Sequence, residues 1–403
     1  MELKKIHISD IGKVVTGKTP RTSIVENYGG DIPFLTPSDD LSYKSVPKTG
    51  KTLTEQGLNE VKNCLLPPHS VCVSCIGTDL GKVVMTSEPT ITNQQFNSII
   101  PNRRFDADFV YYLMTLVGKE LNYLSKTSTA VPIINKSSFS NYEVEVPDLE
   151  TQEKIASILS SLDSKIELNS RINDNLEQQA QALFKSWFVD NSNPNWEETS
   201  LSEVASFVGG YSYTGEELTD CSNIAMATIK NFGRNGGFKA DGFKEINPSA
   251  KLKECHYANL FDILVAHTDL TQNADVIGNA ELLLTYGKYN SIIFSMDLVK
   301  VLPKETFPYR FLLAAMLKNK LFKGHSLGYV NGTTVLHLSK KALPDFEIRK
   351  PSDSESKMMD EVLASYYKRM AELLQENDRL IRLRDTLIPK LMSVKLKIND
   401  LNC

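Results

Sequence analysis

Apolar residues recur at steps of four and three over residues 151–188, and this 3.5-residue period is typical of a coiled-coil seam. The same pattern returns 204 positions later and meets Pro389 near its end. We therefore expect two long helices, each with a narrow apolar stripe that faces a partner helix. The predicted seam positions are Ile155, Leu159, Leu162, Ile166, Asn173, Leu176 and Leu183 in the first helix, and Leu363, Met370, Asn377, Leu380 and Leu387 in the second.

The direction of the second helix follows from the short polar segment between the two halves, residues 191–198. A linker this short would start the second globular part beside the far end of the first helix, so we expect an antiparallel pair. The asparagines do not decide the direction, because Asn377 would face Asn173 in a parallel pair and Asn169 in an antiparallel one. The alternative is that each helix is buried separately against its own globular domain. Polar residues such as Asp163 are assigned to the outer face.

The segments before the two helices are also related to each other. STAVPIINKSSFSNYEVEVP (128–147) matches GTTVLHLSKKALPDFEIRKP (332–351) at the same offset of 204. Strand-like and helix-like stretches predict a mixed α/β (α+β) fold for both halves. The strand-like stretches are residues 70–76, 143–146, 262–266 and 291–301, and the helix-like stretches are residues 106–125 and 308–323.

This repeat predicts the domain organisation of the chain. We expect a first globular domain over residues 1–148, a central helix over 149–190, a linker over 191–198, a second globular domain over 199–351 and a C-terminal helix over 352–403. A helix over residues 151–188 would be about 57 Å long at about 1.5 Å per residue. Two similar heads on such a rod suit a bipartite duplex, or any other long partner with two ends.

Composition indicates an ordinary globular protein, with 41% hydrophobic and 23% charged residues and a net charge of −4. The N-terminus lacks the apolar region of a secretion signal, and no apolar run has the length of a membrane helix. With only six cysteines, we expect a cytoplasmic protein without a disulfide framework or membrane association. Neither globular domain is basic, since residues 1–150 hold 15 Lys and Arg against 17 Asp and Glu, and residues 194–351 hold 17 of each.

Residues 12–19 read GKVVTGKT and fit the P-loop pattern of ATP-binding proteins. A P-loop lies between a buried strand and a helix. Here Asp10 interrupts the residues that would form the buried strand, and the residues that begin at Pro20 do not favour a helix. The repeat places FVGGYS (207–212) at the equivalent position, without Gly-Lys-Thr. A strand that ends in an exposed loop is therefore favoured, and nucleotide hydrolysis at this segment is an alternative.

Two other groups suggest sites that we do not expect to be functional. Cys72 and Cys75 have the spacing of zinc ligands, but the alternation of residues 71–75 places Cys72 on the opposite face from Val71 and Val73, as in a strand, and no second pair follows. His267, Asp269 and Glu281 could pose as acid–base residues, yet no nucleophile or metal ligand set accompanies them.

Four segments are distinctive as sequences, namely GKTPRTSIVENYGGDIPFLTPSDD, IGTDLGKV, NQQFNSI and PDLETQEKIASILSSLDSKIELNSRINDNLEQQAQALFKSWF. They resemble segments of the specificity subunits of type I restriction–modification systems, and the resemblance covers essentially the whole chain. The last is the most specific, through Pro147, Gln152, Ile155, Ala156, Leu159, Leu162, Asp163 and Ile166. The second half departs from it, because PSDSESKMMDEVLASY lacks the Gln and the Ile-Ala pair.

The resemblance implies a non-catalytic subunit in which each globular domain reads one half of a bipartite, asymmetric DNA target. It implies that the coiled coil sets the spacing and docks two modification subunits, which methylate adenine N6 with S-adenosylmethionine. It further implies restriction subunits that cleave DNA with ATP and Mg²⁺, so we expect no cofactor on this chain. Since the domains are not basic, we expect the isolated chain to bind DNA weakly. A two-headed coiled-coil scaffold without DNA binding is the alternative.

Loop residues that suit contacts with phosphates or base edges are the candidate DNA contacts. In the first half these are Lys18, Thr19, Arg21, Ser23, Asn93, Gln94, Gln95, Lys126, Thr127, Ser128 and Thr129. In the second half they are Tyr211, Tyr213, Lys230, Arg234, Asn331 and Thr333. For the amides at 93–95, hydrogen bonding within the loop is an equally good explanation.

Overall fold

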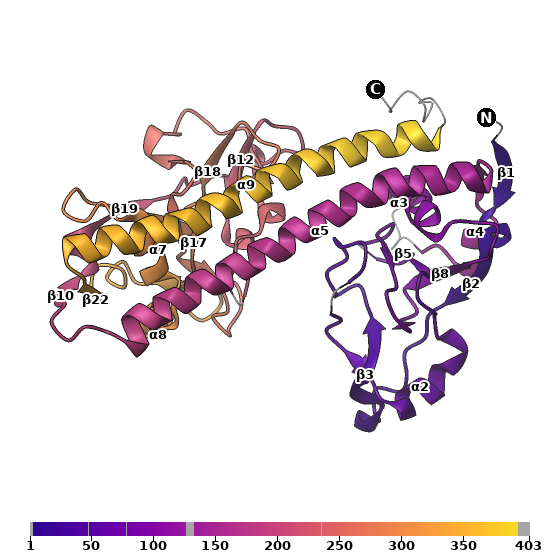
Figure 1. Cartoon of the computed structure of the whole chain (residues 1–403), viewed down its shortest axis with the longest axis horizontal. Coiled ribbons are helices and arrows are strands. Elements are labelled where there is room, and N and C mark those ends of the chain that lie inside the picture. The colour runs from indigo at the N-terminus through magenta and orange to yellow at the C-terminus, as the bar shows by residue number, and fades with distance from the viewer. Residues whose placement is uncertain (1–2, 47, 78, 126–132, 235, 394–403) are drawn as a thin grey trace. The chain divides into compact units, whose positions relative to one another are not determined.

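The computed structural model describes residues 3–46, 48–77, 79–125, 133–234 and 236–393 of the 403-residue chain. The chain divides into a first unit, Met1–Lys165 with Leu380–Cys403, and a second unit, Ile166–Arg379. Two long helices, α5 (Leu149–Lys185) and α9 (Asp353–Met392), each contribute to both units (Figure 1). Among the described residues, no helix has the length and apolarity that crossing a membrane requires.

The first unit is built on an antiparallel sheet of strand order β2-β8-β5-β6, namely β2 (Gly12–Thr16), β8 (Phe96–Pro101), β5 (Val71–Ser74) and β6 (Val83–Met85). A second sheet places β3 (Tyr28–Leu35) between β4 (Thr52–Leu53) and β7 (Ile91–Thr92), and β3 is parallel to β7. Strand β1 (Lys4–His7) pairs with β9 (Glu143–Val146) just before α5. The helices are α1 (Ile8–Ile11), α2 (Glu55–Val61), α3 (Ala107–Ser125) and α4 (Lys136–Ser140).

The second unit repeats this arrangement with the order β11-β19-β15-β17, namely β11 (Ala205–Gly209), β19 (Leu298–Pro303), β15 (Ile263–Ala266) and β17 (Ala280–Leu282). Strand β12 (Ile224–Ala227) is parallel to β18 (Ser291–Phe294), and β13 (Lys244–Glu245) and β14 (Tyr257–Ala258) flank them. Strand β10 (Glu197–Ser200) pairs with β22 (Glu347–Lys350) just before α9. A further sheet joins β16 (Thr268–Asp269), β21 (Leu336–Leu338) and β20 (Val330–Asn331), and the helices are α6 (Leu201–Val204), α7 (Arg310–Leu317) and α8 (Lys320–Leu327).

The repeat extends to a close backbone contact at the end of the first sheet strand. An added Cβ on Gly17, after β2, would lie 2.1 Å from the carbonyl oxygen of Asn93. An added Cβ on Gly210, after β11, would lie 2.0 Å from the carbonyl oxygen of Ser295. Only glycine fits where a neighbouring turn approaches so closely. The predicted fold, with two similar α/β domains and two long helices, is confirmed.

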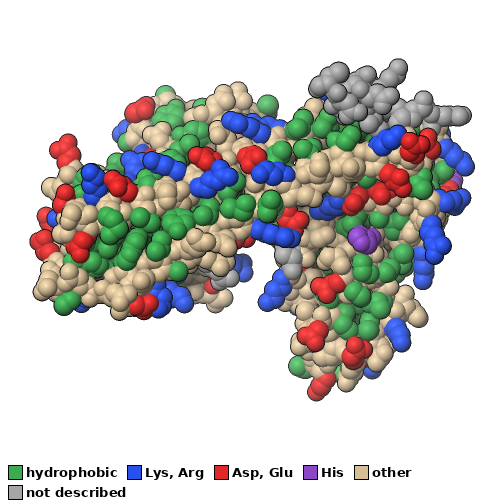
Figure 2. Space-filling model, viewed as in Figure 1, with side chains coloured by type: hydrophobic (Ala, Val, Ile, Leu, Met, Phe, Trp, Pro, Cys, Tyr) green, Lys and Arg blue, Asp and Glu red, His purple; other side chains and the backbone are tan. Residues whose placement is uncertain are grey.

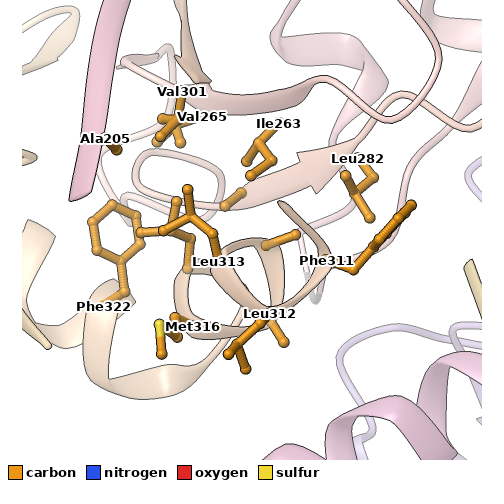
Figure 3. Close-up of a cluster of buried hydrophobic side chains, with 14 of the residues drawn as sticks. Ala205, Ile263, Val265, Leu282, Val301, Phe311, Leu312, Leu313, Met316 and Phe322 are labelled. Atoms are coloured by element: carbon orange, nitrogen blue, oxygen red, sulfur yellow. The ribbon is translucent and has the colours of Figure 1, made fainter. Parts of the chain in front are cut away.

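Each unit has a main core that includes parts of both long helices. In the second unit, α7 and α8 place Leu312, Leu313, Met316 and Phe322 against the sheet strands, whose side chains include Ile263, Val265, Leu282 and Val301 (Figure 3). The same core includes Phe184 of α5 and Leu363 of α9. In the first unit, Leu159 of α5 and Leu391 of α9 belong to one core with α3. The helices are therefore packed on the globular parts as well as on each other.

The two helices run antiparallel in each unit. In the second unit, the Asn169 amide donates to Asn377 Oδ1 at 2.9 Å, and farther along α5 Ala180 shares a core with Tyr367. In the first unit, Arg384 Nη1 lies 2.8 Å from Asp163 Oδ1. Rising numbers on α5 accompany falling numbers on α9. The predicted antiparallel direction is confirmed, with Asn169 rather than Asn173 opposite Asn377.

The start of each long helix is tied to the proline before it. The Gln152 side chain donates to the carbonyl of Pro147 at 2.9 Å, and its Oε1 accepts from the Asp106 N–H at the start of α3. The second half has Ser356 at the equivalent position, and its hydroxyl donates to the carbonyl of Pro351 at 3.3 Å. In the second half, a shorter side chain thus donates a hydrogen bond to the carbonyl of the equivalent proline.

Two predicted elements are interrupted in the structure. The helix expected over residues 308–323 is divided into α7 and α8, because the Asn319 side chain caps α8 by accepting from the N–H groups of Leu321 and Phe322. The strand expected over residues 291–301 is divided into β18 and β19 by a turn in which the Leu298 N–H donates to Ser295. A single π-helical turn, Ser186–Asp190, follows α5.

Candidate nucleic-acid interface

The segment that fits the P-loop pattern is a strand and its end. Residues 12–16 form β2, which pairs with β8. The Gly17 N–H donates to the carbonyl of Phe96 at 3.1 Å, and the Lys18 N–H donates to the carbonyl of Thr92 at 2.9 Å. A P-loop offers such N–H groups to phosphate, whereas here the protein itself uses them. This geometry argues against nucleotide binding at this segment.

The segment after β2 meets the turn between β7 and β8. Lys18 is exposed, and the Thr19 hydroxyl donates to Gln94 Oε1 at 2.6 Å. Gln94 is the exposed tip of its turn. Three candidate contacts from two distant parts of the sequence are therefore brought together on one surface.

The other two amides of this turn are used inside it. The Asn93 side chain is buried and donates to Gln95 Oε1 at 2.8 Å, while Asn93 Oδ1 accepts the Gln95 N–H at 3.1 Å. These bonds support hydrogen bonding within the loop, the alternative considered for these residues. Gln94 is the member of the three that presents its amide to solvent.

Arg21 is fixed by a carboxylate of α2. Its Nε and Nη2 lie 3.0 and 2.7 Å from Glu60 Oε1, and its N–H donates to Glu60 Oε2. The hydrogen bonds from Arg21 lower the pKa of Glu60 to about 2. Ser23 is exposed nearby in the sequence, whereas Lys126, Thr127, Ser128 and Thr129 lie outside the described residues.

Tyr211 is not available as a DNA contact, and this prediction is corrected. Its side chain is 1% exposed, and its hydroxyl donates to Glu217 Oε1 at 2.6 Å. The aromatic ring belongs to a buried cluster with Met226 and Ile293. Tyr213, two residues later, is half-buried and has the Lys244 ammonium 5.9 Å from its ring centroid.

The loop after β12 carries the basic candidates of the second unit. Lys230 and Arg234 are both exposed. Arg234 Nε lies 3.8 Å from Asp275 Oδ2, and the Asn279 amide donates to the carbonyl of Gly233 at 2.9 Å. The loop is thus attached to the segment between β16 and β17.

That segment also meets the turn between β20 and β21. Asn331 and Thr333 are exposed, and the Gln272 amide donates to the carbonyl of Thr333 at 2.6 Å. Loops that carry Arg234, Gln272 and Thr333 therefore lie next to one another. This loop cluster is the candidate interface of the second unit.

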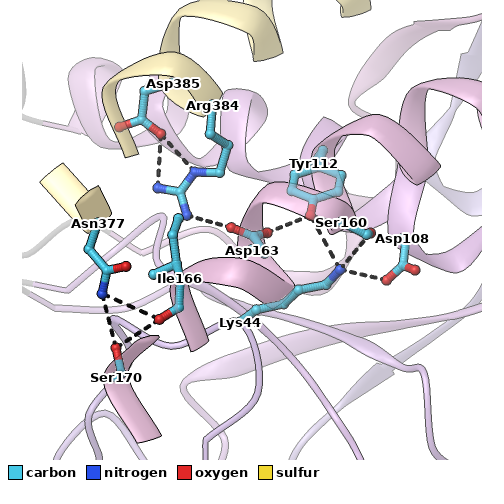
Figure 4. A network of polar contacts seen from close by, with 10 residues as sticks. All are labelled: Lys44, Asp108, Tyr112, Ser160, Asp163, Ile166, Ser170, Asn377, Arg384 and Asp385. Atoms are coloured by element: carbon cyan, nitrogen blue, oxygen red, sulfur yellow. Dashed lines mark hydrogen bonds and ion pairs between the residues drawn. The ribbon is translucent and has the colours of Figure 1, made fainter. Parts of the chain in front are cut away.

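A network that the sequence did not predict connects the loop after β3 to the helices (Figure 4). Lys44 Nζ lies 2.7 Å from Asp108 Oδ1 and 3.1 Å from Ser160 Oγ. The Tyr112 hydroxyl donates to Asp163. The repeat relates this loop to the one after β12, but nothing in the sequence distinguishes Lys44 from other surface lysines.

Asp163 lies at the helix contact, not on the outer face as predicted. Its side chain is 12% exposed and forms the ion pair with Arg384, which also contacts Asp385 (Figure 4). Burial opposes the charge of Arg384, but the two aspartates outweigh it and raise its pKa. The offset of 204 relates Asp163 to Tyr367, so the repeat itself could have indicated a buried position.

The twelve predicted seam residues are all buried or half-buried. Those that are buried are Ile155, Leu159, Asn173, Leu363, Met370 and Asn377, and those that are half-buried are Leu162, Ile166, Leu176, Leu183, Leu380 and Leu387. Asn173 and Asn377 differ in their surroundings. Asn377 bonds to Asn169, whereas the described residues give the buried Asn173 amide no hydrogen-bond partner.

Cys72, Cys75 and Asp269, which belong to the two other groups considered as sites, are buried and contact the protein itself. Cys72 and Cys75 belong to different core clusters, and burial raises their pKa values to about 12 and about 11. Asp269 accepts hydrogen bonds from the N–H groups of Thr271, Val276 and Ile277, so it shapes a loop.

On the face drawn in Figure 2, basic and acidic side chains are interspersed.

The chain is similar to several known proteins in sequence and in structure. Residues 1–178 match the family model "Type I restriction modification DNA specificity domain". The type I restriction enzyme MjaIX specificity subunit of Methanocaldococcus jannaschii is 25% identical over 99% of this chain and 94% of its own length. The HindI specificity subunit of Haemophilus influenzae is 37% identical over 41% of this chain and 38% of its own. The crystal structure of a type I restriction–modification S subunit from M. genitalium has a TM-score of 0.53, with 15% identity over 97% of this chain and 96% of that one.

Proposed function

We propose that this chain is a specificity subunit of a type I restriction–modification system and recognises a bipartite DNA sequence, because residues 1–178 match that family's DNA specificity domain and a specificity subunit is similar to it over 99% of the chain. Each globular part reads one half of the target through its loops. The observation that carries this proposal is the duplicated frame, in which β2-β8-β5-β6 and β11-β19-β15-β17 have the same order. One frame used twice gives a duplex two similar readers, which is the basis of recognition at two half-sites.

The loops on the two frames differ, so the half-sites differ as well. The turn after β7 exposes Gln94, whereas the equivalent turn after β18 exposes Met296. An amide suits the N6 and N7 edge of adenine, and a thioether offers only apolar contact. The proposed target is therefore asymmetric.

Exposed polar residues next to each frame are the proposed DNA contacts. In the first half, Lys18 and Ser23 contact phosphate and Gln94 with Thr19 reads a base edge, while Arg21 offers phosphate the N–H groups that Glu60 leaves free. In the second half, Lys230 and Arg234 contact phosphate, and Tyr213, Asn331 and Thr333 complete the surface. Residues 126–129 remain proposed contacts from the sequence alone.

We further propose that catalysis belongs to partner subunits. Two modification subunits bind this chain and methylate adenine N6 with S-adenosylmethionine, and restriction subunits cleave with ATP and Mg²⁺. The helix pair docks the modification subunits. A scaffold without DNA binding is not favoured, because residues 1–178 match a DNA specificity domain and the MjaIX relative over 99% of the chain is a restriction-enzyme specificity subunit.

Sequencing of methylated adenines tests this function. The chain is co-expressed with a type I modification subunit in a host without adenine methylation, and modified positions are mapped across the genome. We expect one split motif with two different halves. An unsplit motif, or no methylation although the complex assembles, would contradict the proposal.

A further inference from the structure

The loop that carries residues 231–234 and 236–239 is held by Glu281 of β17 and by Asn279, which directly precedes this strand. The Gly237 N–H donates to Glu281 Oε1 at 2.5 Å, and the Asn279 amide donates to the carbonyl of Gly233 at 2.9 Å. Gly236 and Gly237 have φ values of 88° and 93°, a region that strongly favours glycine. The exposed Arg234 therefore stands on a tightly bent loop whose conformation depends on these contacts.

Glu281 is a charged residue in the interior. It lies on β17, its side chain is 3% exposed, and it contacts the Lys318 ammonium, which is 6% exposed. Lys318 also lies 3.1 Å from Glu177 of α5, and 5.7 Å from the ring centroid of Tyr367 on α9. The network thus connects the loop with both long helices inside the second unit.

Burying the ion pair of Glu281 and Lys318 costs desolvation free energy. Removing charges from water is unfavourable, and a well-packed apolar pair is often as stable as a buried ion pair. An apolar residue at position 281 would fill the volume but could not accept the Gly237 N–H. The Glu281 carboxylate therefore supplies the hydrogen-bond acceptor for the Gly237 N–H, which an apolar side chain could not supply.

The first unit has a comparable connection with different residues. Lys44, on the loop after β3, reaches Asp108 of α3 and Ser160 of α5 (Figure 4). Strands β3 and β12 are equivalent, since each runs parallel to the strand before the turn that contacts Gly17 or Gly210. Both halves therefore attach the same loop to the helices through buried or half-buried polar groups.

We propose that Glu281 is a positioning residue for recognition of the second half-site. By accepting the Gly237 N–H while it is paired with Lys318, it fixes residues 231–234 and 236–239, and with them the exposed Arg234, relative to the helices of its own unit. This inference rests on the proposed function, because it concerns how one half of the DNA target is read.

Two matched double variants separate the hydrogen bond from the ion pair. Glu281→Gln with Lys318→Met removes both charges but keeps an oxygen that can accept the Gly237 N–H. Glu281→Met with Lys318→Met removes the same charges, fills nearly the same volume and leaves the N–H without an acceptor. Each chain is co-expressed with the modification subunit, and methylated adenines are mapped as for the unchanged chain.

The proposal predicts a loss confined to the second half of the motif. In the Met–Met variant, discrimination at one or more second-half positions falls about tenfold, as for the loss of one hydrogen bond. The Gln–Met variant stays within about threefold of the unchanged chain, and both variants read the first half normally. A role in stability alone would lower total methylation and the melting temperature without changing sequence preference.

Two results would overturn the proposal: unchanged second-half preference in the Met–Met variant, or equal relaxation in both variants. If the Met–Met variant does not fold, Asn279→Ala decides, because it removes the tether to Gly233 without disturbing a buried charge. Relaxation of the second half by about threefold supports the proposal, and unchanged preference overturns it. Failure of the proposed function would be seen separately, as a wild-type complex without a split motif.

Discussion

The two halves of this chain share a frame but attach it to the helices with different chemistry. In the first unit, Asp163 of α5 forms an ion pair with Arg384 of α9. The offset of 204 places Tyr367 and Ala180 at the equivalent positions of the second unit, where both are buried in an apolar core. Tyr367 stacks on Phe311, with ring centroids 6.1 Å apart.

This difference indicates which features the shared frame requires. Both halves keep the strand order, the glycine at the end of the first strand and a donor to the proline before the helix. The frame therefore tolerates either a polar or an apolar contact between the helices. The loops, which differ most, are where the two halves can acquire different DNA targets.

The largest effect is expected from the polar contact of the first unit. Asp163→Ala leaves Arg384 partly buried without its main partner, so it should destabilise this unit by about 2–4 kcal/mol. Hydrogen exchange of α3 should rise, while α7 in the second unit should keep its protection. The control is Asp385→Ala, whose side chain is 45% exposed and should cost no more than about 0.5 kcal/mol. Equal effects of the two substitutions would show that Asp163 is not the anchor.

A smaller effect distinguishes two asparagines on the same face of α5. Asn169→Leu removes the bond to Asn377 and should destabilise the second unit by about 1–2 kcal/mol. Asn173→Leu replaces a buried amide that has no partner among the described residues and should stabilise it by about 1 kcal/mol. Denaturant unfolding of both variants measures the difference. Changes of the same sign would contradict the assigned register.

The smallest effect is expected from two carboxylates. Glu60 binds the loop after β2 in the first unit, and Glu217 binds the loop after β11 in the second. Hydrogen bonds from Arg21 to Glu60, and from Tyr211 and Thr214 to Glu217, lower both pKa values to about 2. Because an unfolded Glu titrates near about 4.3, these contacts stabilise the fold fully above that pH and are lost as the pH falls towards 2. Carboxyl NMR titration should give both low values, and Glu60→Gln should leave that of Glu217 unchanged. A pKa near 4.3 for either residue would remove it from the comparison.

The sequence predicted the regular parts better than the surface. The heptad pattern and the offset of 204 predicted both long helices, because apolar periodicity directly reflects burial, and the short linker over residues 191–198 predicted their antiparallel direction. Asp163 was misplaced because its partner, Arg384, lies 221 positions away in the sequence. Whether the side chains of Tyr211, Asn93 and Gln95 are free to contact DNA depends on contacts that form only on folding. Local pattern cannot distinguish an exposed loop side chain from one that bonds to its own loop.

The central claim, that each half reads its own part of a bipartite target, is tested most directly by exchanging one half. Residues 1–148 are replaced by the first globular domain of a known type I specificity subunit, and methylated adenines are mapped in the complex with its modification subunit. The account predicts a new first half of the motif, with the second half and the spacer length unchanged. A motif altered in both halves, or in neither, would contradict it.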